Sequence, residues 1–112
     1  MQSSSNAKDI VLSYINAMYS QDYDSVRSYL SDSVKVIGPT GENFRSPDEF
    51  IQMMRKQQGK YELKKAFVDG SDVCLLYDFV TSTFRTFFSS WYKVKDGRII
   101  FIHTVFDTKA FE

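Results

Sequence analysis

The chain has 112 residues with 14 basic and 14 acidic side chains, so its formal net charge at neutral pH is zero. A chain of this length forms one domain, residues 1–112, with little material for a second unit. A neutral chain lacks the basic surface of proteins held on nucleic acid or anionic lipid, so neither partner is expected. No apolar run approaches the ~20 residues of a membrane-spanning helix.

The cysteine content and the first residues bear on the cellular location of the protein, and the aromatic content bears on its core. One cysteine, Cys74, cannot form a disulfide within the chain, and the first residues lack the basic and apolar regions of a secretion signal. We therefore expect a cytoplasmic protein, with residues 1–5 disordered. Phe, Tyr and Trp together make up 16% of the chain, and these rings must be buried somewhere.

Two helices are expected at the start of the chain. Apolar residues at spacings of three and four predict an amphipathic helix over residues 6–20. Asp22 or Asp24 can cap a second, short helix that runs to Leu30.

A short strand and a third helix follow. Residues 34–37 predict a strand that stops at Gly38, because a proline comes next. The third helix has the clearest start signal in the chain: Ser46 as N-cap, then a proline, and a glutamate three residues after the serine. Gly59 marks its predicted end.

From residue 61 onward the hydrophobic period is that of strands, expected at residues 61–68, 73–81, 84–95 and 99–107. Asp96-Gly97 is the strongest hairpin signal, because a two-residue type I′ turn needs positive φ at both positions. Helices followed by a strand meander predict an α+β domain with one antiparallel sheet and helices on one face.

The predicted turns fix the register of the last three strands. Asp96-Gly97 places Lys95 opposite Arg98, and a weaker turn at residues 82–83 places Asp78 opposite Phe87. One face then becomes an apolar, aromatic wall with one carboxylate, formed by Cys74, Leu76, Asp78, Val80, Phe87, Ser89, Trp91, Ile102, Thr104 and Phe106. A one-residue error in either turn would move its members to the opposite face.

The other face of these strands is also largely apolar, and it carries Phe88, Ser90, Tyr92, Phe101, His103 and Val105. Helices can cover only one of the two faces. The sequence therefore predicts a homodimer in which a second copy covers this second face.

The order and spacing of these segments resemble the nuclear transport factor 2-like superfamily, particularly its SnoaL-like branch. The resemblance rests on the opening helix, the link at residues 21–24, the segment 31–36, and the ending at residues 91–99 and 105–107. It implies a cone, in which a curved sheet, mixed at its edge, wraps around three N-terminal helices and leaves an open-ended pocket. This fold includes polyketide cyclases, ketosteroid isomerase, limonene epoxide hydrolase, dehydratases and non-catalytic association modules, so it does not give the function.

The catalytic residues of the ketosteroid isomerase pattern can be compared position by position. Tyr14 matches the tyrosine that donates to the substrate oxygen in that pattern. The general-base aspartate falls at Gly38, just before Pro39, and the second aspartate falls near Ser89. By this resemblance, the chain has the hydrogen-bond donor of the pattern and lacks both of its carboxylates.

The epoxide hydrolase pattern is also incomplete. Its Arg-x-Asp motif and its later aspartate fall at Asp78, Val80 and Thr104. No known catalytic set of the superfamily is complete in this chain, so whether it is an enzyme stays open.

The leading hypothesis is a pocket for a small, mainly apolar or aromatic molecule, with no cofactor and no metal. Its expected ligand contacts are Leu76, Val80, Phe87, Ser89, Trp91, Ile102, Thr104 and Phe106. The alternative is a cofactor-independent isomerase, cyclase or dehydratase, in which Asp78 is the base and Tyr14 the donor. An ion pair between Asp78 and Arg85 is the competing interpretation of that carboxylate. A third hypothesis is an association module whose pocket is filled by its own side chains.

Overall fold

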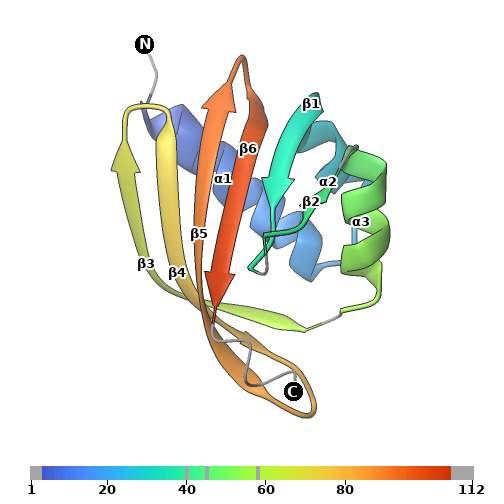
Figure 1. Cartoon of the computed structure of the whole chain (residues 1–112). Helices are drawn as coiled ribbons and strands as arrows, with labels where there is room; N and C mark the ends of the chain where they lie inside the picture. Colours follow the sequence, from blue (N-terminus) through green and yellow to red (C-terminus); the bar gives the residue numbers. More distant parts are fainter. Residues whose placement is uncertain (1–3, 40, 45, 58, 107–112) are drawn as a thin grey trace.

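A computed structural model of the chain describes residues 4–39, 41–44, 46–57 and 59–106. Within these residues, helices lie on one side of a single curved sheet (Figure 1). The helices are α1 (Ser4–Tyr19), α2 (Tyr23–Tyr29) and α3 (Pro47–Arg55). The strands are β1 (Leu30–Ile37), β2 (Asn43–Phe44), β3 (Lys60–Asp69), β4 (Asp72–Val80), β5 (Arg85–Lys95) and β6 (Arg98–Phe106).

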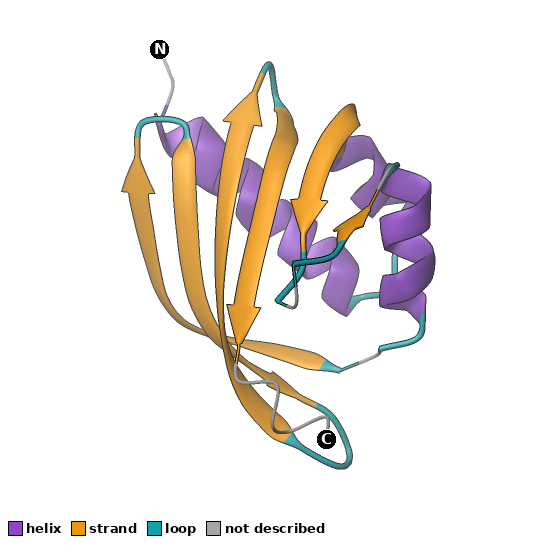
Figure 2. Ribbon diagram, in the orientation of Figure 1, coloured by secondary structure: helices purple, strands orange, loops and turns teal. Residues whose placement is uncertain are grey.

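The sheet has the strand order β2-β1-β6-β5-β4-β3. All neighbouring strands are antiparallel except β1 and β6, which run parallel. The sheet bends along β3, β4 and β5, so that it curves around the helices (Figure 2). The predicted α+β cone with a mixed sheet is therefore confirmed.

The observed helix boundaries differ from the predicted ones at two ends and agree with the prediction at the N-cap of α2. Helix α1 begins at Ser4, so two residues predicted to be disordered are helical, and residues 1–3 lie outside the described residues. Of the two candidate caps of α2, Asp22 is the one used, since its side chain accepts a hydrogen bond from the backbone of Ser25. Helix α3 ends at Arg55 rather than near Gly59.

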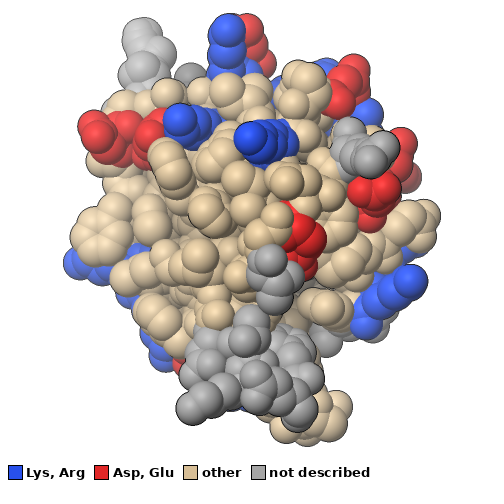
Figure 3. Space-filling model, viewed as in Figure 1, with Lys and Arg blue, Asp and Glu red and all other residues tan. Residues whose placement is uncertain are grey.

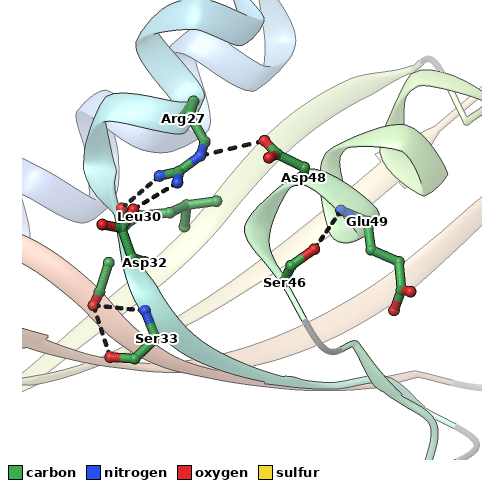
Figure 4. Close-up of polar contacts among 8 residues, drawn as sticks. Arg27, Leu30, Asp32, Ser33, Ser46, Asp48 and Glu49 are labelled. Carbon is green, nitrogen blue, oxygen red and sulfur yellow. Dashed lines mark hydrogen bonds and ion pairs between the residues drawn. The ribbon is translucent and has the colours of Figure 1, made fainter.

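An ion-pair network joins the three segments around α2 (Figure 4). Arg27 donates to Asp32 on β1 at 2.6 Å, and its Nε lies 3.3 Å from a carboxylate oxygen of Asp48 on α3. In the same region Ser46 accepts from the backbone N–H of Glu49 at 3.1 Å, which is the predicted N-cap. These contacts link α2 to the beginning of β1 and to the first turn of α3.

The register of β5 and β6 departs from the prediction by one residue. Lys95 pairs with Arg98, as the turn predicts. Further along, Lys93 pairs with Phe101, which leaves Ile100 as a β-bulge without a partner of its own. Every later pair is therefore shifted by one residue, and β5 turns its side chains to the faces opposite those predicted.

The predicted faces are consequently wrong for β4 and β5. Side chains on these strands that are buried against the helices are Val73, Leu75, Tyr77, Phe79, Thr86, Ser90, Tyr92 and Val94. The expected pocket residues Leu76, Asp78, Val80, Phe87, Ser89 and Trp91 lie on the side of the sheet turned away from the helices, which we call the outer face. The β4–β5 pairing itself is as predicted, so both strands changed faces together.

Strand β6 keeps its predicted faces. Ile102, Thr104 and Phe106 point to the helix side, while Phe101, His103 and Val105 point outward. Phe88, Ser90 and Tyr92, expected at a dimer interface, belong instead to the interior. Phe88 stacks on Phe106 with 4.2 Å between ring centroids, which places both rings inside the cone.

Candidate functional site

A cavity of about 120 Å³ lies between the sheet and the helices, and we call it the cone cavity. It is bordered by α1, the end of β1, the loop between β1 and β2, α3, and the inner faces of β3 to β6. Its described lining residues are Tyr14, Ile15, Val36, Ile37, Gly38, Pro39, Glu42, Phe44, Phe50, Met53, Met54, Gln57, Tyr61, Tyr77, Phe79, Phe88, Tyr92, Ile102, Thr104 and Phe106. Most of these side chains are apolar or aromatic, so the cavity offers mainly apolar contact surface.

A chain of three hydroxyl groups forms the polar part of the interior, and we call it the hydroxyl cluster. The oxygen atoms of Tyr77 and Ser90 lie 2.9 Å apart, and those of Ser90 and Thr104 are also 2.9 Å apart. Tyr77 and Thr104 line the cavity, while Ser90 is fully buried behind them. Because the bulge in β6 sets this register, Ser90 rather than Ser89 meets Thr104.

Two further tyrosines stand beside this cluster. Tyr14 on α1 meets the ring of Tyr92 edge to face, with 5.9 Å between centroids. Burial is the main cause that raises the pKa of Tyr14 and Tyr92, and it raises the pKa of Tyr77 to about 12, although hydrogen bonds to Ser90 and Tyr92 partly offset this effect. These phenols therefore stay protonated at neutral pH and can act as hydrogen-bond donors.

The structure brings only part of the predicted site together. Tyr14, Ile102, Thr104 and Phe106 line the cone cavity. The other expected contacts, on β4 and β5, do not line it, because those strands present the opposite face.

Asp78 does not approach the cavity or Tyr14. Its side chain lies on the outer face, 15% exposed, with one oxygen 2.8 Å from Arg85 Nη1 and 3.6 Å from Lys64 Nζ. The ion pair that competes with a catalytic role is thus the one observed. The pairing of Asp78 as base with Tyr14 as donor is wrong, since the sheet separates the two side chains.

Several lining residues come from segments that the sequence reasoning did not connect with a site. Phe50, Met53 and Met54 are on the apolar face of α3, and Tyr61 is the second residue of the long strand β3. The spacing of the three α3 residues predicted their burial, but not which space they border. No pattern in the sequence predicted that Glu42 borders the cavity, since this residue lies in the loop between β1 and β2.

The remaining reactive side chains lie elsewhere. His103 and Cys74 are on the outer face, where His103 meets the ring edge of Phe101 and Cys74 Sγ lies 3.7 Å from Ser89 Oγ. Among the described residues, no group of His, Cys, Asp and Glu could hold a metal ion. None of the helices in the described part of the chain combines the length and apolar character needed to cross a bilayer.

A second cavity of about 250 Å³ lies between α1 and the inner side of β3 and β4. It shares Ile15, Tyr61 and Tyr77 with the cone cavity, so these three side chains stand between the two spaces. Its described lining adds Leu12, Asn16, Leu63 and Leu75. It contains fewer hydroxyl groups than the cone cavity, and we regard it as the less specific of the two.

A curved mixed sheet closed by three helices over an internal cavity defines the class of nuclear transport factor 2-like proteins. Residues 11–102 match the SnoaL-like domain family. The chain therefore belongs to the SnoaL-like family, which confirms the resemblance seen in the sequence. No curated protein sequence matches the chain.

Solved structures of other proteins share this fold. An NTF2-like protein of unknown function from Cytophaga hutchinsonii is 28% identical, with a TM-score of 0.87 and 95% of each chain covered. An M. tuberculosis LEH-like epoxide hydrolase is 21% identical, with a TM-score of 0.80, covering 94% of this chain and 85% of its own. A de novo designed protein with a curved β-sheet is 19% identical, with a TM-score of 0.84, covering 96% and 92%. These similarities show the fold and not the function, which must be argued from the cavity.

Proposed function

We propose that this protein binds a small, mainly apolar molecule in the cone cavity and holds an oxygen atom of that molecule with hydroxyl groups. The observation that carries the proposal is a cavity of about 120 Å³ whose apolar lining meets the hydroxyl cluster.

The volume favours a ligand of about one six-membered ring. An apolar cavity of roughly 150 Å³ in another protein accommodates benzene, so the volume of the cone cavity suits a single ring.

The polarity favours a carbonyl or hydroxyl group on that ring. Tyr14, Tyr77 and Thr104 border the cavity, and each carries a hydroxyl that can donate a hydrogen bond. A carbonyl oxygen placed among them would exchange its water contacts for protein contacts in a mainly apolar space. A hydrocarbon of the same size would leave those donors unused.

The test is a titration of the protein with cyclohexanone, benzaldehyde and cyclohexane, followed by amide chemical shifts. Both carbonyl compounds should bind more tightly than cyclohexane, with shifts centred on the cavity lining. Met54→Trp should fill the cavity and abolish binding, whereas Gln52→Trp, on the exposed side of the same helix, should not. Equal binding to both variants, or no binding of any of the three compounds, would overturn the proposal.

The association-module hypothesis predicts a cavity filled by the protein's own side chains. The open space bordered by the hydroxyl cluster favours ligand binding over that hypothesis. A cytoplasmic location, which rests on cysteine content and the first residues, stays a prediction of the sequence.

We further propose that the outer face pairs two copies of the chain. Phe87, Trp91 and Val105 expose 53%, 40% and 49% of their surface there. Lys, Arg, Asp and Glu lie mainly toward the edges of this side of the molecule, and uncharged side chains cover much of the area over β5 and β6 (Figure 3). An exposed apolar area bordered by charge is typical of protein interfaces.

Light scattering after size exclusion tests the dimer. The wild-type protein should have twice the 13.0 kDa mass of one chain at micromolar concentration. Trp91→Lys should give the single-chain mass with an unchanged circular dichroism spectrum. Tyr19→Lys, at an exposed aromatic position on α1, is the matched control and should stay dimeric. A wild-type species of 13.0 kDa would overturn the proposal.

A further inference from the structure

A β-bulge lies within β3, the strand at one edge of the sheet. Leu63 pairs with Tyr77, and the next pair joins Lys65 to Leu76, so Lys64 is an extra residue without a strand partner of its own. A bulge of this kind changes the direction of the side chains around it. Its effect on the inner side of the sheet can be followed from the contacts of the two lysines.

Both lysines at the bulge point to the outer face. Lys64 Nζ lies 3.6 Å from a carboxylate oxygen of Asp78, and Lys65 Nζ lies over the ring of Phe67, 5.9 Å from its centre. Both of these partners belong to the outer face. The inner side of β3 therefore carries no side chain between positions 63 and 66.

The second cavity, of about 250 Å³, lies at this gap. Leu75 and Tyr77 stand on β4 opposite the two ends of the gap, and both line the cavity together with Leu63. Leu12 on α1 lines the other side. The cavity is about twice as large as the cone cavity, and its rim is exposed at Asn16 and Leu63. The bulge thus accounts for an apolar space that is open to solvent at one end.

The side chains between the second cavity and the cone cavity are held unequally. The hydroxyl of Tyr77 is fixed by its hydrogen bond with Ser90 at 2.9 Å. Within the part of the chain that the structure describes, the hydroxyl of Tyr61 has no hydrogen-bond partner, and its ring packs on Tyr77 and Phe79 with 5.5 and 5.1 Å between centroids. Tyr61 also borders a third space of about 10 Å³ between the ends of α1 and α3. Turning this ring aside therefore breaks ring contacts alone.

We propose that the second cavity binds an apolar chain carried by the molecule whose ring lies in the cone cavity. This inference rests on the proposed function and defines its ligand more closely, as a ring ketone or ring alcohol with an alkyl or alkenyl substituent of several carbons. The chain passes beside Tyr61 and contacts Leu12, Leu63 and Leu75. A chain fits better than a fused second ring, because only the space freed by one side chain connects the two cavities.

The lining favours an apolar chain because it holds few groups that such a chain would leave without a hydrogen bond. Its aliphatic residues are Leu12, Ile15, Leu63 and Leu75, and the amide of Asn16 lies at the exposed rim, where water reaches it. Each methylene moved from water to such a surface strengthens binding by about fourfold. Displacement of Tyr61 and ordering of the chain offset part of this gain, so a chain of four carbons should strengthen binding by about tenfold or more.

Amide chemical shifts during titration with cyclohexanone and with 4-butylcyclohexanone test the inference. The butyl compound should bind the wild type about tenfold or more tightly and should shift the amides of Leu12 and Leu63 as well as those of the cone cavity. Leu63→Trp narrows the second cavity and should remove most of this difference while cyclohexanone still binds. Lys65→Trp, on the outer face of the same strand, is the matched control and should keep the full difference.

Two further variants examine the helix wall and the passage. Leu12→Trp fills the second cavity from α1 and should also remove the difference, which keeps the test decisive if circular dichroism shows that Leu63→Trp does not fold. Tyr61→Leu leaves the passage open, so the ratio of the two affinities should rise above the wild-type ratio. A ratio at or below the wild-type value would contradict a chain that passes beside Tyr61 and would overturn the inference.

The remaining outcomes separate this inference from the proposed function. If cyclohexanone shifts the cone-cavity amides but the butyl compound binds no more tightly, the second cavity is not part of the ligand site and the proposed function stands. The same holds if Leu63→Trp and Leu12→Trp both keep the full difference. If neither ketone shifts the cone-cavity amides, the proposed function fails and this inference fails with it.

Discussion

Arg85 Nη1 lies 2.8 Å from Asp78 Oδ2 and 2.7 Å from Glu62 Oε1 on the outer face of the sheet. The three residues come from β5, β4 and β3, so one guanidinium links three adjacent strands. This arrangement accounts for a carboxylate on an otherwise apolar stretch of β4. Its role is structural, and it lies on the opposite side of the sheet from the cone cavity.

Replacing Asp78 with asparagine should therefore affect stability slightly and the cavity not at all. The pair is close to solvent, so we expect a loss of about 1 kcal/mol at most in the free energy of unfolding. Urea denaturation measures this loss, and cyclohexanone binding should equal that of the wild type. Loss of ligand binding in a folded Asp78→Asn protein would contradict this assignment.

The hydroxyl cluster should be sensitive to loss of its central member. Ser90→Ala removes the partner of both Tyr77 and Thr104 at a fully buried position, which should cost about 1–3 kcal/mol of unfolding free energy. Ser89→Ala, one residue away on the outer face, is the matched control and should cost less than about 0.5 kcal/mol. Urea unfolding of both variants measures the difference, and similar losses would contradict the assigned faces.

Alkaline pH should unfold the protein through its buried tyrosines. Burial raises the pKa of Tyr77 from 10.0 to about 12, and those of Tyr14, Tyr61 and Tyr92 are raised as well. The folded state then retains protons that the unfolded chain releases, so stability is full below pH 10 and falls as pH rises through 12. At about 1.4 kcal/mol per pH unit, Tyr77 alone removes about 3 kcal/mol.

Tyrosinate absorbance and circular dichroism, recorded together against pH, test this expectation. Part of the tyrosine absorbance change should coincide with loss of the dichroism signal above pH 10. Ionisation of all seven tyrosines near pH 10 with the fold intact would contradict it.

The turn between β5 and β6 should tolerate change at one position and not at the other. Asp96 has a φ of 53° and Gly97 a φ of 77°. Gly97→Ala places a Cβ in the left-handed region and should cost about 1 kcal/mol or more, whereas Asp96→Asn keeps a residue suited to it. Thermal unfolding compares the two, and equal midpoints would contradict the turn assignment.

The sequence was sufficient for the order of the elements because local signals were strong. Ser46 with its following proline gave the start of α3, and the Asp96-Gly97 pair gave the last hairpin. The two-residue strand β2 had no periodic signal, because two residues are too few to show a period. The parallel pairing of β1 with β6 joins segments far apart in the chain, and only the family resemblance indicated a mixed sheet.

The predicted faces of β4 and β5 were wrong because the prediction was made from β6, and the bulge at Ile100 shifts the pairing of β5 with β6 by one residue. The positions of the charged residues on β5 indicated the correct outward face. On β5 the outward residues include Arg85, Lys93 and Lys95, while the inward set has no charged residue. Counting charges on each side of β4 and β5 would have oriented these two strands without any assumption about register.

Part of the cavity could not be predicted at all. The apolar face of α3 was visible in the sequence, but its packing against β1 and the ion pairs of Arg27 with Asp32 and Asp48 were not. The approach of Glu42 to Gly38 depends on loop closure, which leaves no periodic pattern. Such contacts follow from tertiary packing and not from local propensity.

The position of β6 between β1 and β5 has a consequence for how the protein is made. Strands β1 and β2 join the rest of the sheet only through β6, whose partner β1 precedes it by more than sixty residues of chain, about the separation of Leu30 and Ile99. During synthesis, the two halves of the cavity wall therefore remain unconnected in the sheet until β6 leaves the ribosome. Pairing at such sequence separation is slow to form. Ligand binding should thus require β6, because a nascent chain that lacks this strand lacks one wall of the cone cavity.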